Sequence, residues 1–202
     1  AGLLAALFMA RFASKKLLRL MRPAISLLAG IPSVVYGFFG MVVIVPLVRA
    51  LFGGSGSSLL AASLLLGMMI LPTIITVAES ALRAVPDAYY EGALALGATH
   101  ERAVFRVVLP AAKSGVTAGV ILGVGRAIGE AMAVIMVSGN VPNMPSLFQS
   151  VRFLTTAVAS EMSYAAAGLQ RQALFSIALV LFLFIMLINA ALNFFLKRSK
   201  ER

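Results

Sequence analysis

The stretch ESALRAVPDAYYEGALALGATHERAVFRVVLPAAK, residues 79–113, decides how the rest of the chain is interpreted. It is too polar to cross a membrane and too amphipathic to serve as a linker. Proline suits the first turn of a helix, so Pro86 predicts a helix start. Gly97 permits a sharp backbone turn, Thr99 can cap a second helix, and Pro110 predicts that this helix ends before it. We therefore expect two short helices that meet at a glycine and pack on another structure.

Four long apolar stretches lie around this loop, at residues 31–52, 57–78, 114–138 and 173–196. Each can cross the roughly 30 Å hydrocarbon core of a bilayer as a helix. Membrane strands would be shorter and separated by turns, so the predicted fold is an all-α membrane protein, a multi-span transmembrane helical bundle. Residues 1–10 cover only about 15 Å as a helix. We interpret them as the end of a truncated span, and residues 1–202 as a single transmembrane domain of an N-terminally truncated chain.

The composition agrees with a membrane protein, because 61% of the 202 residues are hydrophobic and only 12% are charged. The chain has no Cys and one His, so a thiol site or a zinc centre is not expected and the metal prediction is none. Basic residues outnumber acidic ones, 17 to 7, but they lie in short clusters between apolar runs. That placement indicates membrane topology and not a nucleic-acid surface.

The basic residues also predict an orientation, with the connection at residues 11–30 in the cytoplasm. Only Arg49, Arg152 and Arg171 then lie outside, and Arg126 falls within a span. The remaining basic residues are all cytoplasmic: Arg11, Lys15, Lys16, Arg19, Arg22, Arg83, Arg102, Arg106, Lys113, Lys197, Arg198, Lys200 and Arg202. The amphipathic segment at residues 15–28 predicts an interfacial helix, and the long outer connection at residues 140–172 predicts a further short helix.

The cytoplasmic loop resembles the signature of ABC importer permeases, in which Glu-Ala-Ala, three residues, Gly, nine residues, an aliphatic residue, any residue and Leu-Pro follow one another. The matching positions here are Glu91, Gly92, Ala93, Gly97, Val107, Leu109 and Pro110. Gly92 departs from the pattern, and Val107 is a conservative replacement. The resemblance implies that this loop is the ATPase-coupling loop, which docks on a separate ATP-binding subunit and transmits nucleotide-driven movement.

Two further runs, LAGIPSVVYG at residues 28–37 and GRAIGEAMAVIMVSGN at residues 125–140, resemble phosphate ABC transporter permease subunits of the PstC type. This family implies a MetI-like fold in the bacterial plasma (inner) membrane. It implies a permease subunit of an ATP-driven phosphate importer, with a dimer of ATP-binding subunits, a second permease subunit and an extracytoplasmic phosphate-binding protein. The alternatives are a permease for another oxyanion, such as sulfate or molybdate, and the sister phosphate permease subunit.

Other classes of protein fit the sequence less well. Gly92 and Gly97 have part of the spacing of a phosphate-binding P-loop, but the lysine and the preceding strand are absent. We therefore expect no cofactor in this chain and ATP use by a partner subunit. A membrane enzyme is disfavoured because there is no nucleophile motif, acidic pair within a span or metal-ligand cluster, so the catalytic prediction is none. A purely scaffolding membrane protein would have no need of Arg126 within a span.

Arg126 and Glu130 are the candidate substrate-pathway residues. In a continuous helix over residues 114–138, Arg126 would lie at the midpoint and Glu130 one turn away on the same face. A charge at that depth costs roughly 2.5 to 3.5 kcal/mol, so the pair should face the protein interior or an aqueous cavity. One hypothesis is an anion pathway in which the guanidinium binds phosphate. The other is a structural ion pair.

Small residues recur every four positions in the same predicted span. They are Gly115, Gly119, Gly123 and Ala127, followed by Ala131. Such a stripe lets a neighbouring helix approach closely, so it predicts a packing surface and not a binding site.

Overall fold

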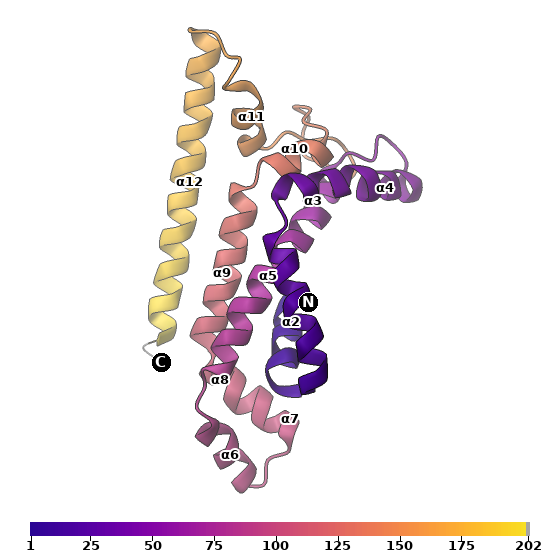
Figure 1. Cartoon of the computed structure of the whole chain (residues 1–202). Helices are drawn as coiled ribbons and strands as arrows, with labels where there is room; N and C mark the ends of the chain where they lie inside the picture. The colour runs from indigo at the N-terminus through magenta and orange to yellow at the C-terminus, as the bar shows by residue number, and fades with distance from the viewer. Residues whose placement is uncertain (201–202) are drawn as a thin grey trace. The chain divides into compact units, whose positions relative to one another are not determined.

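The computed structural model describes the backbone of residues 1–200 and the side chains of residues 1–194. Lys197, Arg198 and Lys200 of the topology prediction have no described side chains, and Arg202 lies outside the described residues. The described chain is helical with no named strand, so the predicted all-α fold is confirmed (Figure 1). Its elements in order are α1 (Gly2–Leu7), the π-helical turn η1 (Phe8–Phe12), α2 (Lys15–Gly30), α3 (Ser33–Phe39), the π-helical turn η2 (Gly40–Ile44), α4 (Val45–Phe52), α5 (Leu59–Arg83), α6 (Asp87–Ala95), α7 (His100–Ala103), the π-helical turn η3 (Val104–Val108), α8 (Leu109–Ala111), α9 (Lys113–Gly129), α10 (Met132–Ser138), α11 (Leu154–Glu161) and α12 (Leu169–Lys200).

Three helices of the described chain are long and apolar enough to cross a membrane: Ser33–Phe52, Leu59–Arg83 and Leu169–Phe194. They fall on three of the four predicted spans. A fourth span results only if the helices from His100 to Ala111 and from Lys113 to Gly129, which are bent by 70°, count as one. The apolar helix Gly2–Phe12 is shorter.

The predicted continuous helix over residues 114–138 is wrong, because α9 ends at Gly129 and α10 begins at Met132. The Glu130 carboxylate accepts a hydrogen bond from the Ala133 amide (3.0 Å), which caps the start of α10. The hydroxyl of Thr155 donates to the Glu130 carbonyl (3.1 Å), in place of a helical amide. Because Glu130 makes these hydrogen bonds with the start of α10 and with Thr155, it does not continue α9.

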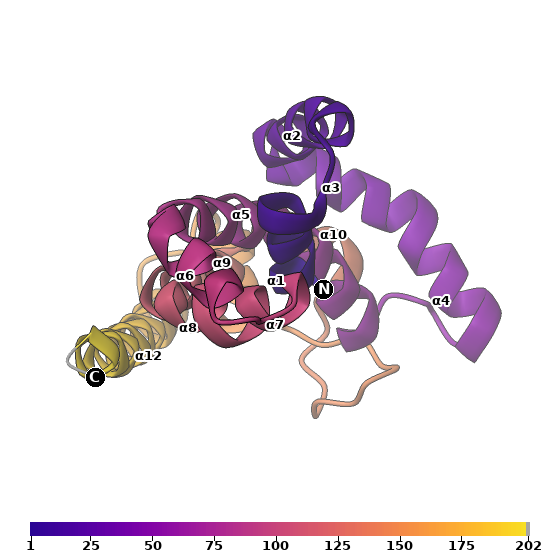
Figure 2. The ribbon, with the colours of Figure 1, turned by 90° about the horizontal axis from the view of Figure 1, so that it is seen from below.

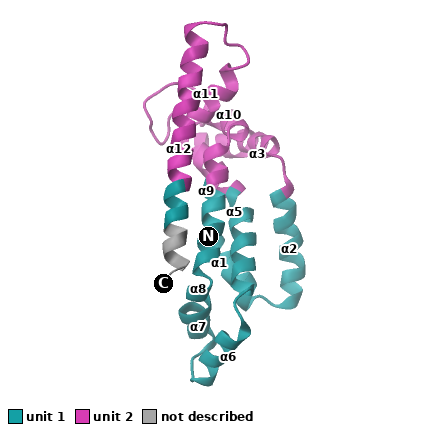
Figure 3. Cartoon of the chain, turned by 90° about the vertical axis from the view of Figure 1, so that its left-hand side faces the viewer, with its two compact units in different colours: residues 1–29, 70–124, 190–202 teal, residues 30–69, 125–189 magenta. Residues whose placement is uncertain are grey.

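The described chain falls into two compact units (Figure 3). Unit 1 comprises residues 1–29, 70–124 and 190–202, and unit 2 comprises residues 30–69 and 125–189. The prediction of a single transmembrane domain stays a prediction.

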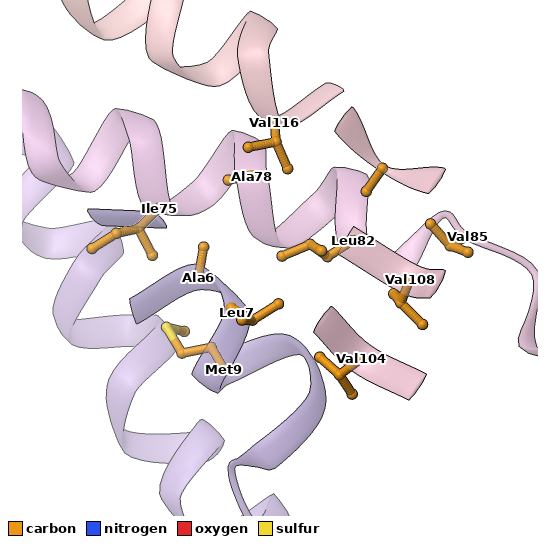
Figure 4. Close-up of a cluster of buried hydrophobic side chains, with 11 residues drawn as sticks. Ala6, Leu7, Met9, Ile75, Ala78, Leu82, Val85, Val104, Val108 and Val116 are labelled. Carbon is orange, nitrogen blue, oxygen red and sulfur yellow. The ribbon is translucent and has the colours of Figure 1, made fainter. Parts of the chain in front are cut away.

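Unit 1 has a core in which the first helix packs on the end of α5 and on η3, as Figure 4 shows. Its buried residues are Ala6, Leu7, Met9, Ile75, Ala78, Leu82, Val85, Val104, Val108, Ala112 and Val116. Helix α5 continues to Arg83, beyond the predicted end at residue 78, because Ala78 and Leu82 are buried in this core. The core therefore connects a span-length helix directly to the loop at residues 79–113, for which the sequence predicts a cytoplasmic position.

Unit 2 has a core built from α3, η2, α4, the first half of α5 and α10. Its buried residues are Tyr36, Ile44, Val45, Val48, Ala61, Ala62, Leu65, Met69, Ala133, Val134 and Val137. A Cβ atom added at Gly37 would lie 2.9 Å from the Cα atom of Ala133, so α3 and α10 are in backbone contact there. This contact brings together the two runs that resemble the PstC-type permeases.

Candidate functional site: the cytoplasmic loop and the α9–α10 break

The cytoplasmic loop forms the predicted pair of helices. Helix α6 follows Pro86, and Gly97 takes the left-handed conformation with φ of +85°, which disfavours residues with a side chain. Thr99 caps α7 by accepting a hydrogen bond from the Arg102 amide (3.3 Å). Helices α6, α7 and α8 lie together beside α1 (Figure 2).

The sequence predicts that the second helix of the loop ends before Pro110, and this prediction is wrong. The helix continues through η3 and α8 to Ala111. In η3 the Leu109 amide donates to the carbonyl of Val104, five residues back. This wider turn comes directly before Pro110, which has no amide hydrogen, and the helix passes the proline there.

Arg11 anchors the loop, a role that the sequence did not reveal. Its guanidinium donates to the carbonyls of Leu82 (3.2 Å) and Val85 (3.5 Å) and pairs with the carboxylate of Asp87 (3.2 Å). The last carbonyls of a helix have no partner within it, so Arg11 satisfies the end of α5 and holds the start of α6. Its side chain is only 14% exposed. No local spacing could have indicated this role, because the partners lie more than 70 residues away.

A second contact fixes α6 against α7. The hydroxyl of Tyr90 and Nδ1 of His100 are 2.8 Å apart, and the ring of Phe12 packs edge-on against the His100 ring at 4.7 Å. The turn between the two helices projects away from this cluster, since Leu96 is 91% exposed. The loop thus has a fixed base and an exposed apolar tip.

The motif positions lie on both parts of the loop. Glu91, Gly92 and Ala93 belong to α6, where none is buried, and Gly97 forms the turn. Val107 belongs to η3, and Leu109 and Pro110 belong to α8 beside the buried core. Their coupling role stays a prediction.

Arg126 and Glu130 lie on either side of the α9–α10 break. Arg126 is half-buried in the last turn of α9, three residues before the helix ends, and not at the middle of a span. A cation in the last turn of a helix is stabilised by the helix dipole. Glu130 lies in the break itself, so the two residues do not share a helix face. Their role in the pathway stays a prediction, and Thr155 joins them as a residue that sequence reasoning missed.

The segment after α10, for which the sequence predicts an outer position, is fixed by polar contacts. Arg152 pairs with Glu161 (2.6 Å) and donates to the carbonyl of Asn140 (3.1 Å), while the Thr156 hydroxyl donates to the Asn140 side chain (3.1 Å). Helix α11 is the short helix expected in residues 140–172.

Comparison with known proteins shows to which family the chain belongs. The family model for the binding-protein-dependent transport system inner membrane component matches residues 2–202. The chain belongs to this family. The match, with the three apolar helices, confirms a multi-pass inner-membrane protein.

Relatives confirm the resemblance of this family member to PstC-type permeases. The chain is 42% identical to the probable ABC transporter permease protein YqgH of Bacillus subtilis, over 93% of this chain and 63% of the relative. It is 38% identical to the phosphate transport system permease protein PstC of Pasteurella multocida, over 88% of this chain and 62% of the relative. With PstC of Mesorhizobium japonicum it shares 32% identity over 100% of this chain and 68% of the relative. The chain thus spans less than two thirds of the first two relatives.

The fold of this permease family is also seen in a solved structure. An inward-facing conformation of the MetNI methionine ABC transporter superposes with a TM-score of 0.76 at 20% identity, over 98% of this chain and 85% of that chain. The expected MetI-like fold is therefore confirmed.

In unit 1, the small residues of α9 face α5. A Cβ atom added at Gly115 would lie 2.5 Å from the Cβ of Ala81, and one at Gly123 would lie 2.7 Å from Ile74. A Cβ atom at Gly119 would lie 3.3 Å from the Ala78 amide nitrogen. Ala127, further along α9, belongs to unit 2. These distances leave no room for larger side chains at the three glycines.

Proposed function

We propose that the whole protein is the transmembrane permease subunit of an ATP-driven importer of inorganic phosphate. The observation that carries this proposal is the similarity to proteins named as PstC phosphate permeases over most of the chain. Support also comes from the contact at Gly37 and Ala133, which joins the two runs that carry the resemblance. A permease for another oxyanion is the second candidate, because YqgH is named only as a probable ABC transporter permease.

ATP is handled by other polypeptides in this proposal. The glycines of the loop lack the lysine of a P-loop, and an ABC importer permease works with separate ATP-binding subunits. The chain itself carries no cofactor and no ATPase site, although the whole complex hydrolyses ATP. Its partners are a dimer of ATP-binding subunits, a second permease subunit and an extracytoplasmic phosphate-binding protein.

Two features of the loop support the proposed coupling role. The exposed side chains of Tyr89, Leu94 and Leu96 offer apolar surface that an ATP-binding subunit can cover. The base of the loop is tied by Arg11 to the end of α5, so a displacement of the loop is transmitted to a spanning helix. ATP binding would thus move the permeases between inward-facing and outward-facing states.

Rescue of growth tests the proposed function directly. A bacterium that lacks its PstC subunit should grow on low phosphate when it receives the full-length protein together with its own partner subunits. Failure to grow, with all subunits present in the membrane, would argue for another substrate.

Replacing Gly97 by valine should weaken the coupling between transport and ATP hydrolysis. Valine disfavours a positive φ, at a cost of order 1–3 kcal/mol, although nothing lies within 4 Å of its Cβ position. The ATP-binding subunits should co-purify less well and show less stimulated hydrolysis, while membrane insertion persists. Gly67→Val is the matched control, because Gly67 lies within α5 outside the coupling loop and its Cβ position is also open. Unchanged co-purification and hydrolysis in the Gly97 variant would remove the loop from the coupling role.

Substitutions of Glu130 should separate its charge from its capping role. Glutamine keeps an oxygen that can accept from the Ala133 amide, whereas alanine does not, and a lost cap costs about 0.5–2 kcal/mol. We expect Glu130→Gln to alter transport or the preference for phosphate over sulfate at unchanged thermal stability. Glu130→Ala should in addition lower the melting temperature. If both variants transport normally and with normal preference, Glu130 has only a structural role.

A further inference from the structure

Two cavities lie next to each other in unit 1, between α2 and the end of α5. The first has a volume of about 270 Å³, and its lining includes Arg22, Glu79 and Arg83. The second has a volume of about 500 Å³, and Lys15 and Arg19 line it together with Arg22 and Arg83. The two arginines that are common to both make this one continuous basic site.

The charges of this site do not balance. One carboxylate, that of Glu79, accepts hydrogen bonds from Arg22 (2.8 Å) and from Arg83 (2.8 Å) and is only 10% exposed. Lys15 and Arg19 make no hydrogen bond or ion pair with the side chains that the structure describes. The two cavities together are lined by four cationic side chains and one carboxylate, and the excess positive charge favours an anionic ligand.

The two paired arginines keep donors for such a ligand. Arg22 uses Nε and one terminal nitrogen on Glu79, and Arg83 uses Nε on Glu79 and a terminal nitrogen on the Met9 carbonyl. The other terminal nitrogen, Nη1, of each makes no hydrogen bond within the described chain. Guanidinium groups held in this way suit the oxygens of a phosphate ester.

The surroundings of the site indicate a lipid. Helix α2 buries none of its residues, and Leu20 and Leu27 are 71% and 73% exposed beside its basic side chains. A basic amphipathic helix of this kind lies in the interface of a membrane, and the distribution of basic residues puts it on the cytoplasmic side. An anionic lipid can meet the cations with its headgroup and, with its acyl chains, the apolar side chains that line the cavities, Ile25 in the first and Leu18 and Pro23 in the second. Inorganic phosphate can meet only the cations.

We propose that α2 and the end of α5 form a binding site for the phosphodiester headgroup of an anionic lipid of the cytoplasmic leaflet. Arg19 and Lys15 contact the headgroup oxygens from α2, and Arg22 and Arg83 contact them through their Nη1 atoms. Glu79 orients the two arginines. The occupied site stabilises α2 against the helix that leads into the cytoplasmic loop.

The test uses the full-length protein in its assembled complex and cardiolipin as the probe, with bound lipid counted by native mass spectrometry. Lys15→Gln with Arg19→Gln should weaken cardiolipin binding about a hundredfold or more, since each hydrogen bond to a charged group contributes about 1.5–3 kcal/mol. The matched control is Lys16→Gln with Arg102→Gln, which removes the same charge from cytoplasmic residues that line neither cavity. The control should retain binding within about twofold. Thermal unfolding verifies that both variants fold.

Three results would overturn the proposal. Absence of bound cardiolipin from the wild-type complex would show that something else, such as a partner subunit, covers this surface. Equal losses of cardiolipin binding in both double variants would indicate that the lipid is attracted by the overall positive charge and is not held at a specific site. Displacement of cardiolipin by inorganic phosphate at equal concentration, with the same dependence on Lys15 and Arg19, would indicate a site for the free anion and not for a lipid.

Discussion

Replacing Arg126 by alanine should reduce phosphate uptake by about a hundredfold or more while the complex still assembles and inserts. Removal of one member of a desolvated charged interaction costs roughly 2–5 kcal/mol. Arg126 is half-buried at the end of α9, beside the break that Glu130 forms. Its planar guanidinium suits a phosphate oxyanion. Uptake of labelled phosphate into vesicles that contain the complete complex measures the effect.

Two further variants make this prediction specific. Arg126→Lys keeps the charge but not the planar fork, so it should retain part of the uptake. Arg171→Ala removes an exposed cation at the start of α12 and should have little effect. Normal uptake by an assembled Arg126→Ala complex would exclude the pathway role, and loss of assembly would favour a structural role.

Replacing Gly115 by leucine should prevent stable folding of the permease. The first carbon of the new side chain would lie 2.5 Å from the Cβ of Ala81, which can move only with the backbone of α5. Overpacking of a core typically costs 1–3 kcal/mol and more where the backbone must shift, which is a large part of the stability of a protein. The amount of folded protein recovered in mild detergent, together with its melting temperature, measures the effect.

The control for this substitution lies on the same helix. Gly125→Leu introduces the same side chain at a position where nothing lies within 4 Å of the Cβ atom, so its melting temperature should change little. A similar loss of stability in both variants would show that leucine is harmful for a reason other than the contact with α5.

The sequence predicted the features that depend on short-range rules. Three of the predicted spans follow from apolar length, and the turn at Gly97 and the cap at Thr99 follow from the conformational preferences of single residues. The break at Glu130 did not follow, because the run around it is apolar and contains no proline. At this break the Glu130 carbonyl accepts a hydrogen bond from Thr155, which lies 25 residues further along the chain.

The candidate site was predicted only in part for the same reason. The sequence identifies Arg11 only as one of the basic residues that indicate membrane topology. Its contacts with Leu82, Val85 and Asp87 are not predicted, because they join segments that are distant in the chain. The placement of Arg126 at the middle of a span was wrong because it depended on a helix that does not continue. Long-range polar contacts of this kind leave no periodic pattern in the sequence.

The central claim is that this protein is a permease for phosphate in an ATP-driven importer. The most direct measurement is uptake of labelled phosphate by proteoliposomes that contain the full-length permease, its partner permease and the ATP-binding subunits, with the phosphate-binding protein outside and ATP inside. We predict uptake that requires both ATP and the binding protein and that excess sulfate or molybdate does not reduce. Uptake of sulfate or molybdate in place of phosphate, or phosphate uptake that needs no ATP, would contradict the claim.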